Sequence, residues 1–324
     1  MDGIVNVLKQ AGMTSHDVVA KLRKIYHTRK VGHTGTLDPD ATGVLPVCIG
    51  QATRLVEYLT EKEKTYKTIL KFGCETNTQD ASGEMTVQTE LPTLTREEFV
   101  AVTKQFIGEI QQIPPMYSAI KKDGQPLYKL ARQGITVDVE ARPVQIYDIK
   151  VLMYHPESAM LEIRCGKGTY IRTLCQDIGR ACGSSAHMAF LMRTASGPFD
   201  ASTAVPLARL EQADHPEVFL TDMNTSLAGM PALVAVDKTM KIRVQNGLAQ
   251  SIPGAAQLAE GTLCRALDET GTLLAIGVIA NGQFQPNKVF QSFKQENTQE
   301  NAVQEKNSQE NNMQEKTEDR NVVK

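Results

Sequence analysis

The most regular alternation of side chains along the chain runs from residue 64 to residue 73. Tyr66, Leu70 and Phe72 fall on one face of this segment, and Lys67 and Lys71 fall on the other. A period of two residues predicts a strand with one face in a core. Apolar runs predict further strands at residues 4–8, 44–49, 144–154, 160–165 and 186–192.

Helical spacing occurs in several segments that begin with capping residues. Thr14 or Ser15 is suited to cap a helix that runs through residue 26. Thr95 and Glu98 fit a capping box for a helix that runs to about residue 107. Further helices are predicted at residues 53–59, 127–133 and 170–178. Strands outnumber helices and few strand–helix–strand crossovers occur, so we predict an α+β fold on a large mixed or antiparallel sheet with flanking helices.

The composition changes twice along the chain, and we place domain boundaries at these changes. Residues 1–230 contain most of the predicted elements and form a first domain. Residues 231–290 are short apolar segments separated by glycines, which predicts a small β-rich module. From Gln291 the chain is rich in Gln, Glu, Asn and Lys, so residues 291–324 are predicted to be a disordered tail. We expect a cut after Phe293 to leave turnover intact.

Composition narrows the class of protein. The chain has 324 residues, 41% of them hydrophobic, and no apolar stretch approaches the roughly 18 residues of a membrane helix. The N-terminus has no apolar signal core, and the six cysteines show neither a Cys-x-x-Cys pair nor a Cys/His cluster with zinc spacing. We therefore expect a cytoplasmic protein with reduced, buried thiols, no metal site and no membrane contact.

The distribution of charge indicates a nucleic-acid partner more clearly than the total does. The net charge is −2, and the segment from Gln291 alone carries five Lys/Arg and seven Asp/Glu, so the rest of the chain is neutral. Residues 18–37 contain no acid and five basic residues: Lys21, Arg23, Lys24, Arg29 and Lys30. Such a stripe is typical of contact with a phosphate backbone, and a solvated helix face is the alternative.

One carboxylate, Asp38, lies in a Gly- and Pro-rich loop that leads directly into the apolar segment at residues 44–49. A rigid loop at the edge of a sheet suits a nucleophile. A carboxylate needs no separate activation by a base, because its reference pKa is about 3.9 and it is ionised at neutral pH. An ordinary Asp-Pro turn is the alternative.

Further motifs accompany this loop along roughly residues 3–200. In chain order, the motifs are Gly32 to Pro46, Lys64 to Tyr66, Asp80 to Gly83, Pro114 to Lys121, Arg142 to Val144, Gly168 to Arg172, and Leu191. With these motifs the chain resembles the bacterial tRNA pseudouridine synthases of the TruB type, which isomerise uridine 55 in the T-loop. The resemblance implies a pseudouridine synthase catalytic domain at residues 1–230 and a PUA-like RNA-binding module at residues 231–290. It also implies that no metal or organic cofactor is needed.

The resemblance implies that Asp38 is the nucleophile, which attacks either C1′ of the ribose or C6 of the uracil. Arg172 is the expected partner of Asp38, because a guanidinium would orient the carboxylate and favour its charged form. From the residues alone, Arg172 could equally form an ordinary surface ion pair or contact a phosphate. The sequence does not identify the base that removes the C5 proton.

Four other residues are implied to contact the substrate. Tyr66 offers a ring that stacks on an extruded base, Tyr170 contacts the uridine and is a candidate to help remove the C5 proton, and Leu191 is an apolar wall. His33 would insert into the folded T-loop and hold the base out of its stack. Each has a plainer interpretation: packing for Tyr66, Tyr170 and Leu191, and an exposed loop position for His33.

The expected partner is tRNA, bound through its T-arm and elbow, with Lys21, Arg23, Lys30 and Lys121 as candidate contacts to the RNA backbone. No protein partner is implied, and we expect a monomer. Two other functions stay open. One is an RNA-binding protein that remodels the tRNA elbow, with catalysis incidental, and the other is a pseudouridine synthase for messenger or ribosomal RNA.

Overall fold

The structure, a computed structural model, describes residues 1–122 and 124–290. The chain divides into two compact units, the first of which spans Met1–Gly229 and the second of which begins at Met230. Each unit has its own cluster of buried apolar side chains. The predicted disordered tail, residues 291–324, lies outside the described residues.

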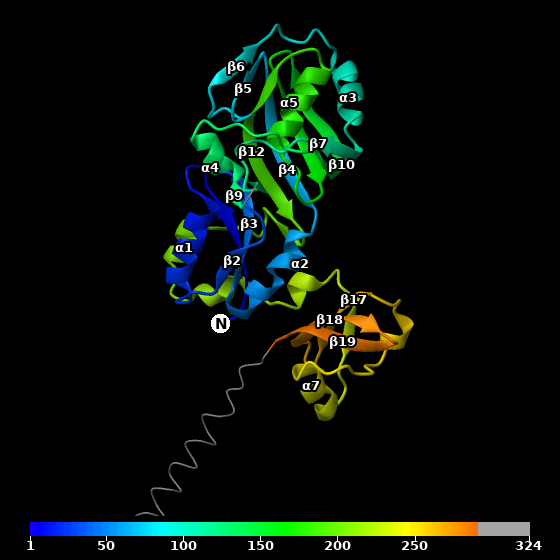
Figure 1. The fold of residues 1–324 in the computed structure, drawn as a ribbon. Coiled ribbons are helices and arrows are strands. Elements are labelled where there is room, and N and C mark those ends of the chain that lie inside the picture. The colour runs from blue at the N-terminus through cyan, green and yellow to red at the C-terminus, as the bar shows by residue number, and fades with distance from the viewer. Residues whose placement is uncertain (123, 291–324) are drawn as a thin grey trace, which may run out of the picture. The chain divides into compact units, whose positions relative to one another are not determined.

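A large mixed sheet forms the centre of the first unit, as predicted for an α+β fold (Figure 1). Within the described residues the strand order is β14-β1-β3-β12-β4-β11-β10-β7, with β2 and β15 paired to β3 and β1, and β13 paired to β12. Most pairs are antiparallel, while β1 with β14 and β3 with β12 are parallel. The strands are β1 Gly3–Lys9, β2 Val31–His33, β3 Thr42–Ile49, β4 Lys64–Phe72, β7 Gly108–Gln112, β10 Arg142–His155, β11 Ser158–Cys165, β12 Ala186–Ser196, β13 Phe199–Asp200, β14 Val205–Pro206 and β15 Leu220–Thr221.

Strand β4 confirms the prediction made from the alternation of its side chains. Lys64, Tyr66, Thr68, Leu70 and Phe72 are buried, and the positions between them are exposed or half-buried. The strand lies between β12 and β11, so its backbone is hydrogen-bonded on both edges. It is therefore a central strand of the sheet, and its buried face carries one of the candidate site residues.

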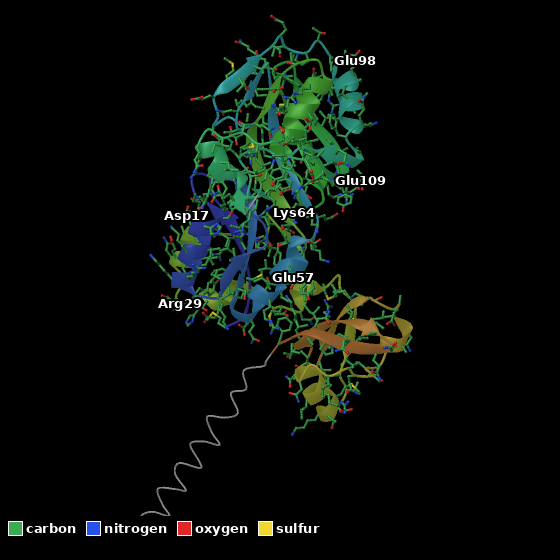
Figure 2. All side chains as sticks on the ribbon, in the orientation of Figure 1. Asp17, Arg29, Glu57, Lys64, Glu98 and Glu109 are labelled. Carbon is green, nitrogen blue, oxygen red and sulfur yellow. The ribbon has the colours of Figure 1, made fainter. Side chains whose placement is uncertain are left out.

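The predicted helix starts and stops are also largely confirmed. Thr14 caps α1 (Ser15–Ile25) in a capping box with Asp17, and Figure 2 shows Asp17 near the start of α1 and Arg29 beyond its end. Thr95 and Glu98 form the predicted capping box of α3 (Arg96–Lys104). Helix α5 (Ile171–Ala181) buries its apolar face against β12 and β4, and α3 contacts α5 and β10 (Figure 1).

Shorter elements complete the first unit. The helix predicted at residues 53–59 is divided into a 3-10 helix, η1 (Gly50–Leu55), and α2 (Val56–Thr60). Two small hairpins pair β5 (Cys74–Thr76) with β6 (Met85–Gln88), and β8 (Lys121–Lys122) with β9 (Gln125–Pro126). The remaining helices are α4 Leu127–Arg132, α6 Leu207–Glu211, η2 Pro216–Phe219 and η3 Thr225–Leu227.

The second unit is a four-stranded sheet in its described part, with the order β16-β17-β18-β19. Its elements are β16 Ala232–Val234, α7 Lys238–Gln245, η4 Ala255–Gln257, β17 Leu263–Leu267, β18 Leu273–Ala280 and β19 Gln283–Val289. The prediction of short strands alone missed α7. This helix buries only Val244, so it lacks the apolar stripe by which helices are recognised in a sequence. Its N-terminus is capped by Asp237.

The cysteines and the helices bear on two of the expectations from composition. All six cysteines are free thiols, five of them buried and Cys74 half-buried. Over the residues that the structure describes, none of the helices has the length and apolar character needed to cross a membrane.

Candidate active site

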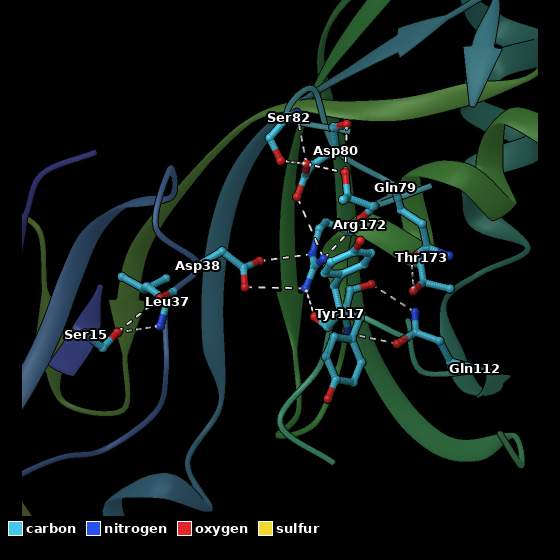
Figure 3. A network of polar contacts seen from close by, with 12 residues as sticks. Ser15, Leu37, Asp38, Gln79, Asp80, Ser82, Gln112, Tyr117, Arg172 and Thr173 are labelled. Atoms are coloured by element: carbon cyan, nitrogen blue, oxygen red, sulfur yellow. Dashed lines mark hydrogen bonds and ion pairs between the residues drawn. The ribbon is translucent and has the colours of Figure 1, made fainter. Parts of the chain in front are cut away.

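The loop that carries Asp38 connects β2 to β3 and is fixed by the first residue of α1. The Ser15 hydroxyl accepts a hydrogen bond from the Leu37 N–H at 2.9 Å and donates one to the Leu37 carbonyl at 3.1 Å. Both backbone groups of Leu37 are thus satisfied by one buried side chain (Figure 3). The residue next to Asp38 therefore has little freedom to move.

Asp38 faces Arg172, a residue in the first turn of α5. The Arg172 Nε lies 3.0 Å from Asp38 Oδ2, and Nη2 lies 3.4 Å from Oδ1 (Figure 3). The Arg172 side chain is only 6% exposed, whereas that of Asp38 is 38% exposed. A guanidinium buried to this extent is poorly placed to contact a phosphate, and it holds the carboxylate from its buried side.

The remaining donors of Arg172 are directed to other groups of the protein. Its Nη1 donates to the Thr78 carbonyl at 3.1 Å, and Nη2 donates to the Tyr117 carbonyl at 3.0 Å. A second carboxylate, Asp80, lies 3.8 Å from Nη1 and accepts hydrogen bonds from the hydroxyls of Thr78 and Ser82. The guanidinium plane is therefore fixed on several sides, and its fork cannot rotate away from Asp38.

Opposing influences act on the Asp38 carboxyl. Burial raises its pKa above the ordinary value, the Arg172 charge lowers it, and the Asp80 charge raises it again. A carboxylate with a raised pKa is more basic than usual once it is ionised. The site therefore contains a partly buried carboxylate that is exposed on one side and paired with a fixed guanidinium on the other.

Lys9, at the end of β1, is a buried cation that holds the same loop. Its ammonium donates to the carbonyls of Pro39 at 2.9 Å and Ala41 at 2.6 Å, and to that of Gln10 at 2.9 Å. Burial lowers the pKa of Lys9 to about 8, and the charges of Asp40 and Asp38 oppose this decrease. Sequence reasoning missed Lys9, because a lysine after an apolar strand is usually solvent-exposed.

A chain of polar side chains fixes the segment around Asp80 against α5. Gln79, whose φ of 63° is unusual for a residue other than glycine, accepts a hydrogen bond from Thr173 and donates one to Gln176. Gln176 donates to Glu75 at 2.7 Å, and Arg180 donates to both carboxylate oxygens of Glu75 at 2.8 Å. This network, which sequence reasoning did not identify, supports the backbone that accepts from Arg172.

Tyr66 and Leu191 lie on neighbouring strands and belong to the core of the first unit. Tyr66 is 9% exposed and Leu191 is 7% exposed. In the pairing of β4 with β12, Leu191 is opposite Thr68 and Arg193 is opposite Tyr66, so Tyr66 and Leu191 are diagonal neighbours on one face. Burial raises the pKa of Tyr66, and Asp38 is near enough to add to this effect.

Tyr170 immediately precedes α5 and is fixed through its backbone. Its N–H donates to the Gln112 side chain at 2.8 Å, and its carbonyl accepts from the same side chain at 3.1 Å. Burial raises the pKa of the Tyr170 phenol, on which Arg172 and Asp38 also act. The phenol therefore lies within electrostatic reach of the carboxylate and its guanidinium partner.

His33, on β2, is half-buried rather than exposed. Its ring packs edge-on against His16 with ring centres 5.6 Å apart, and its Nδ1 accepts a hydrogen bond from the Gly35 N–H at 3.3 Å. Burial lowers the pKa of His33 to about 4. The imidazole is therefore neutral at physiological pH and acts through shape and hydrogen bonding, not through charge.

The candidate contacts to the RNA backbone differ in their surroundings. Lys21 forms an ion pair with Glu211 at 2.8 Å, so part of its charge is already compensated. Arg23 on α1, Lys30 after it, and Lys121 on β8 are exposed.

Within residues 1–122 and 124–290, no group of three or more His, Cys, Asp or Glu side chains is placed to hold a metal ion.

Comparison with protein families gives two adjoining matches. The family model for the TruB family pseudouridylate synthase (N terminal domain) matches residues 23–171, and that for the tRNA pseudouridylate synthase B C-terminal domain matches residues 172–225. The two matches meet between Ile171 and Arg172. Asp38 and Arg172 therefore fall in different matched segments and meet only in the folded first unit.

Individual proteins are similar over most of the chain. The tRNA pseudouridine synthase B of Alkaliphilus oremlandii is 47% identical over 247 residues, which is 76% of this chain and 82% of that protein. That of Heliobacterium modesticaldum is 42% identical over 297 residues, which is 90% of this chain and 96% of that protein. Among solved structures, the crystal structure of a Cbf5-Nop10-Gar1 complex contains a similar chain, with 27% identity and a TM-score of 0.68. The match covers 90% of this chain and 85% of that one.

Proposed function

Because the chain belongs to the TruB family of pseudouridylate synthases, we propose that it isomerises uridine 55 in the T-loop of tRNA to pseudouridine. The protein is then an isomerase that acts on tRNA, in agreement with relatives named tRNA pseudouridine synthase B. The reaction breaks the N1–C1′ bond of the uridine and forms a C5–C1′ bond. A proton leaves C5 and a proton is regained at N1, so no redox equivalent is consumed.

The single observation that carries the proposal is the pairing of Asp38 with Arg172 at 3.0 Å. The carboxylate has an open side and the guanidinium is buried, so the carboxylate can approach a substrate while its position is held. Asp38 would attack C1′ of the ribose or C6 of the uracil. In either case the base is freed to turn and rejoin through C5, and Asp38 is released when the product forms.

The target base must leave its stack, which costs a few kcal/mol. We propose that Tyr66 stacks on the extruded uracil and that Leu191 provides an apolar wall, which their diagonal placement on β4 and β12 supports. Tyr170 would contact the uridine from the start of α5, near Asp38. His33, as a neutral ring, would take the place of the base in the T-loop.

Binding of the folded RNA would use charge and a second module. We propose that the exposed residues Arg23, Lys30 and Lys121, with Lys21 in a lesser role, contact the phosphate backbone. Residues 1–230 would serve as the catalytic domain, and residues 231–290 as a PUA-like RNA-binding module. We further propose that the enzyme works in the cytoplasm as a monomer, without a protein partner.

Asp38→Asn tests the proposal. The variant should lose tritium release from tRNA labelled at C5 of uridine while it keeps most of its affinity for tRNA, because the side chain retains its size. Asp40→Asn is the matched control, since Asp40 is an exposed carboxylate in the same loop and should retain most of the activity. Undiminished turnover by Asp38→Asn would refute the assignment of the nucleophile.

The alternative functions predict other results. If the protein mainly remodels the tRNA elbow and catalysis is incidental, Asp38→Asn should keep this remodelling role although it forms no pseudouridine. If the enzyme modifies another RNA, a strain from which its gene is deleted should still contain pseudouridine at position 55 of tRNA. Mapping pseudouridine in the RNA of that strain therefore identifies the RNA that the enzyme modifies.

A further inference from the structure

Arg193, on β12, is a buried cation that no step of the proposed reaction uses. It is 1% exposed, and among the described residues no carboxylate forms an ion pair with it. Its Nε donates to the Val44 carbonyl at 2.7 Å, and its Nη2 donates to the Gly35 carbonyl at 3.1 Å. A buried charge without a counterion is costly unless polar groups surround it, and here two backbone carbonyls accept hydrogen bonds from the guanidinium.

The two carbonyls that Arg193 holds lie on either side of Asp38. Gly35 precedes Asp38 in the loop, and Val44 follows it in β3. Lys9 holds carbonyls between these two points. The ends of the loop are therefore fixed to one guanidinium, and its middle is fixed to a separate ammonium.

The backbone of Arg193 on β12 lies between β3 and β4 and pairs with both strands. It is opposite Gly43 in the parallel pairing with β3 and opposite Tyr66 in the antiparallel pairing with β4. Gly43 has a φ of 107°, and a Cβ added there would lie 2.1 Å from the Arg193 carbonyl oxygen. Only glycine permits this approach of β3 to β12, and β12 in turn pairs with β4, the strand of Tyr66.

The Arg193 side chain also acts on the Tyr66 phenol. Burial raises the pKa of Tyr66, and the nearby Arg193 opposes this rise both through its charge and as a hydrogen-bonding partner. Since the two residues are opposite one another on neighbouring strands, their side chains lie on the same face. One guanidinium thus contacts the loop of Asp38 and lies beside the ring proposed to stack on the base.

We propose that Arg193 is a positioning residue that fixes Asp38 and Tyr66 relative to one another. This inference rests on the proposed function, in which the carboxylate and the ring act on the same nucleotide. A displacement of about 1 Å costs a reaction about 10²-fold, so a shared anchor has a direct effect on rate. Lysine cannot replace it, because an ammonium lacks the planar fork that reaches Gly35 and Val44 together.

The test compares Arg193→Lys with the wild type in single-turnover tritium release at saturating enzyme. We expect the rate per folded molecule to fall about 10²-fold, with the dissociation constant for tRNA changed by less than about threefold. Phe99→Leu is the control for stability, since Phe99 is fully buried on α3 away from this loop. It should lower the melting temperature and leave the single-turnover rate unchanged.

Two further measurements keep the proposal testable if Arg193→Lys is poorly folded. Hydrogen exchange at the amides of residues 35–41 should become faster in Arg193→Gln or Arg193→Lys, at a temperature where both are folded. Tyr66→Phe, which deletes only the hydroxyl, should lower the rate by itself. The Arg193→Lys change should then cost less in the Tyr66→Phe background than in the wild type.

Each outcome bears on one proposal or the other. A wild-type rate and wild-type exchange in Arg193→Lys, with Asp38→Asn inactive, would overturn the role of Arg193 and leave the proposed function intact. Faster loop exchange in Arg193→Lys together with an active Asp38→Asn would instead overturn the nucleophile. Strict additivity of the Tyr66 and Arg193 substitutions would contradict the shared anchor.

Discussion

Replacing Arg172 by lysine keeps the positive charge but removes the planar fork. In the wild type, three nitrogens of Arg172 reach Asp38, Thr78 and Tyr117 at 3.0–3.1 Å. An ammonium has all its donors on one atom, so it cannot replace three nitrogens that each reach a different group. Up to two charge-assisted contacts are then lost by a side chain that is only 6% exposed.

The size of the effect follows from these contacts. A hydrogen bond to a charged group contributes about 1.5–3 kcal/mol, so two such bonds correspond to about 3–6 kcal/mol. Since about 1.4 kcal/mol is a tenfold change in rate, the upper limit is a decrease of about 10⁴-fold. A carboxylate that moves by about 1 Å already costs about 10²-fold, which sets the lower limit. We expect Arg172→Lys to slow single-turnover tritium release by about 10²–10⁴-fold, within these limits.

Affinity for tRNA should change little, because the Arg172 side chain is only 6% exposed. Filter binding should give a dissociation constant within about threefold of the wild type. Arg180→Lys is the matched control, since Arg180 lies on the same helix and also pairs with a buried carboxylate, Glu75, but away from Asp38. The reasoning fails if Arg172→Lys reacts within fivefold of the wild type, or if Arg180→Lys is equally slow at the same fraction folded.

Three more predictions follow from the charges of the site. The reaction needs the ionised Asp38 carboxylate, so the rate should fall on acidification. Because the Asp80 charge raises the pKa of Asp38, Asp80→Asn should shift the midpoint of this fall to lower pH. A midpoint that moves to higher pH in the pH–rate profile would be contrary evidence. Glu75→Gln should reduce the free energy of unfolding by about 2 kcal/mol, because Arg180 and Gln176 lose a charged acceptor. Calorimetry should show a melting temperature lower by about 4–8 °C, and an unchanged value would count against the network. Burial lowers the pKa of His33 from 6.5 to about 4 in the folded state. The contribution of His33 to stability is therefore complete above pH 6.5 and is lost as the pH falls toward 4. The free energies of unfolding of the wild type and His33→Gln, measured in urea, should converge in acid.

Much of the fold was predictable because regular patterns produced it. The alternation in β4 and the capping boxes of α1 and α3 are local signals, and the structure retains them. The motifs also contained Asp38 and Arg172, which the structure places side by side. Helix α7 was missed because it buries so little apolar surface.

The supporting residues of the site could not be predicted, for a physical reason that two strand ends illustrate. The strand predicted at residues 4–8 continues to Lys9, and that predicted at residues 186–192 continues through Arg193 to Ser196. Both predicted strands ended just before a charged residue, because such a residue is normally solvent-exposed. Here distant carbonyls surround each charge, and that environment exists only after the sheet has formed. Gln79 and Glu75 likewise gain their roles only through contacts with α5.

The strand order has a consequence for synthesis of the protein on the ribosome. Strands β3 and β4 follow one another in the chain, yet they do not pair, because β12 is inserted between them. At about 5–20 residues per second, roughly 10 s separate the emergence of β4 from that of β12. During that interval both strands expose open edges, which invite pairing with other nascent chains. Ribosome-associated chaperones would therefore be needed most while residues 73–185 are being translated. A polypeptide released in this interval would contain Asp38 but lack β12, and with it Leu191 and Arg193.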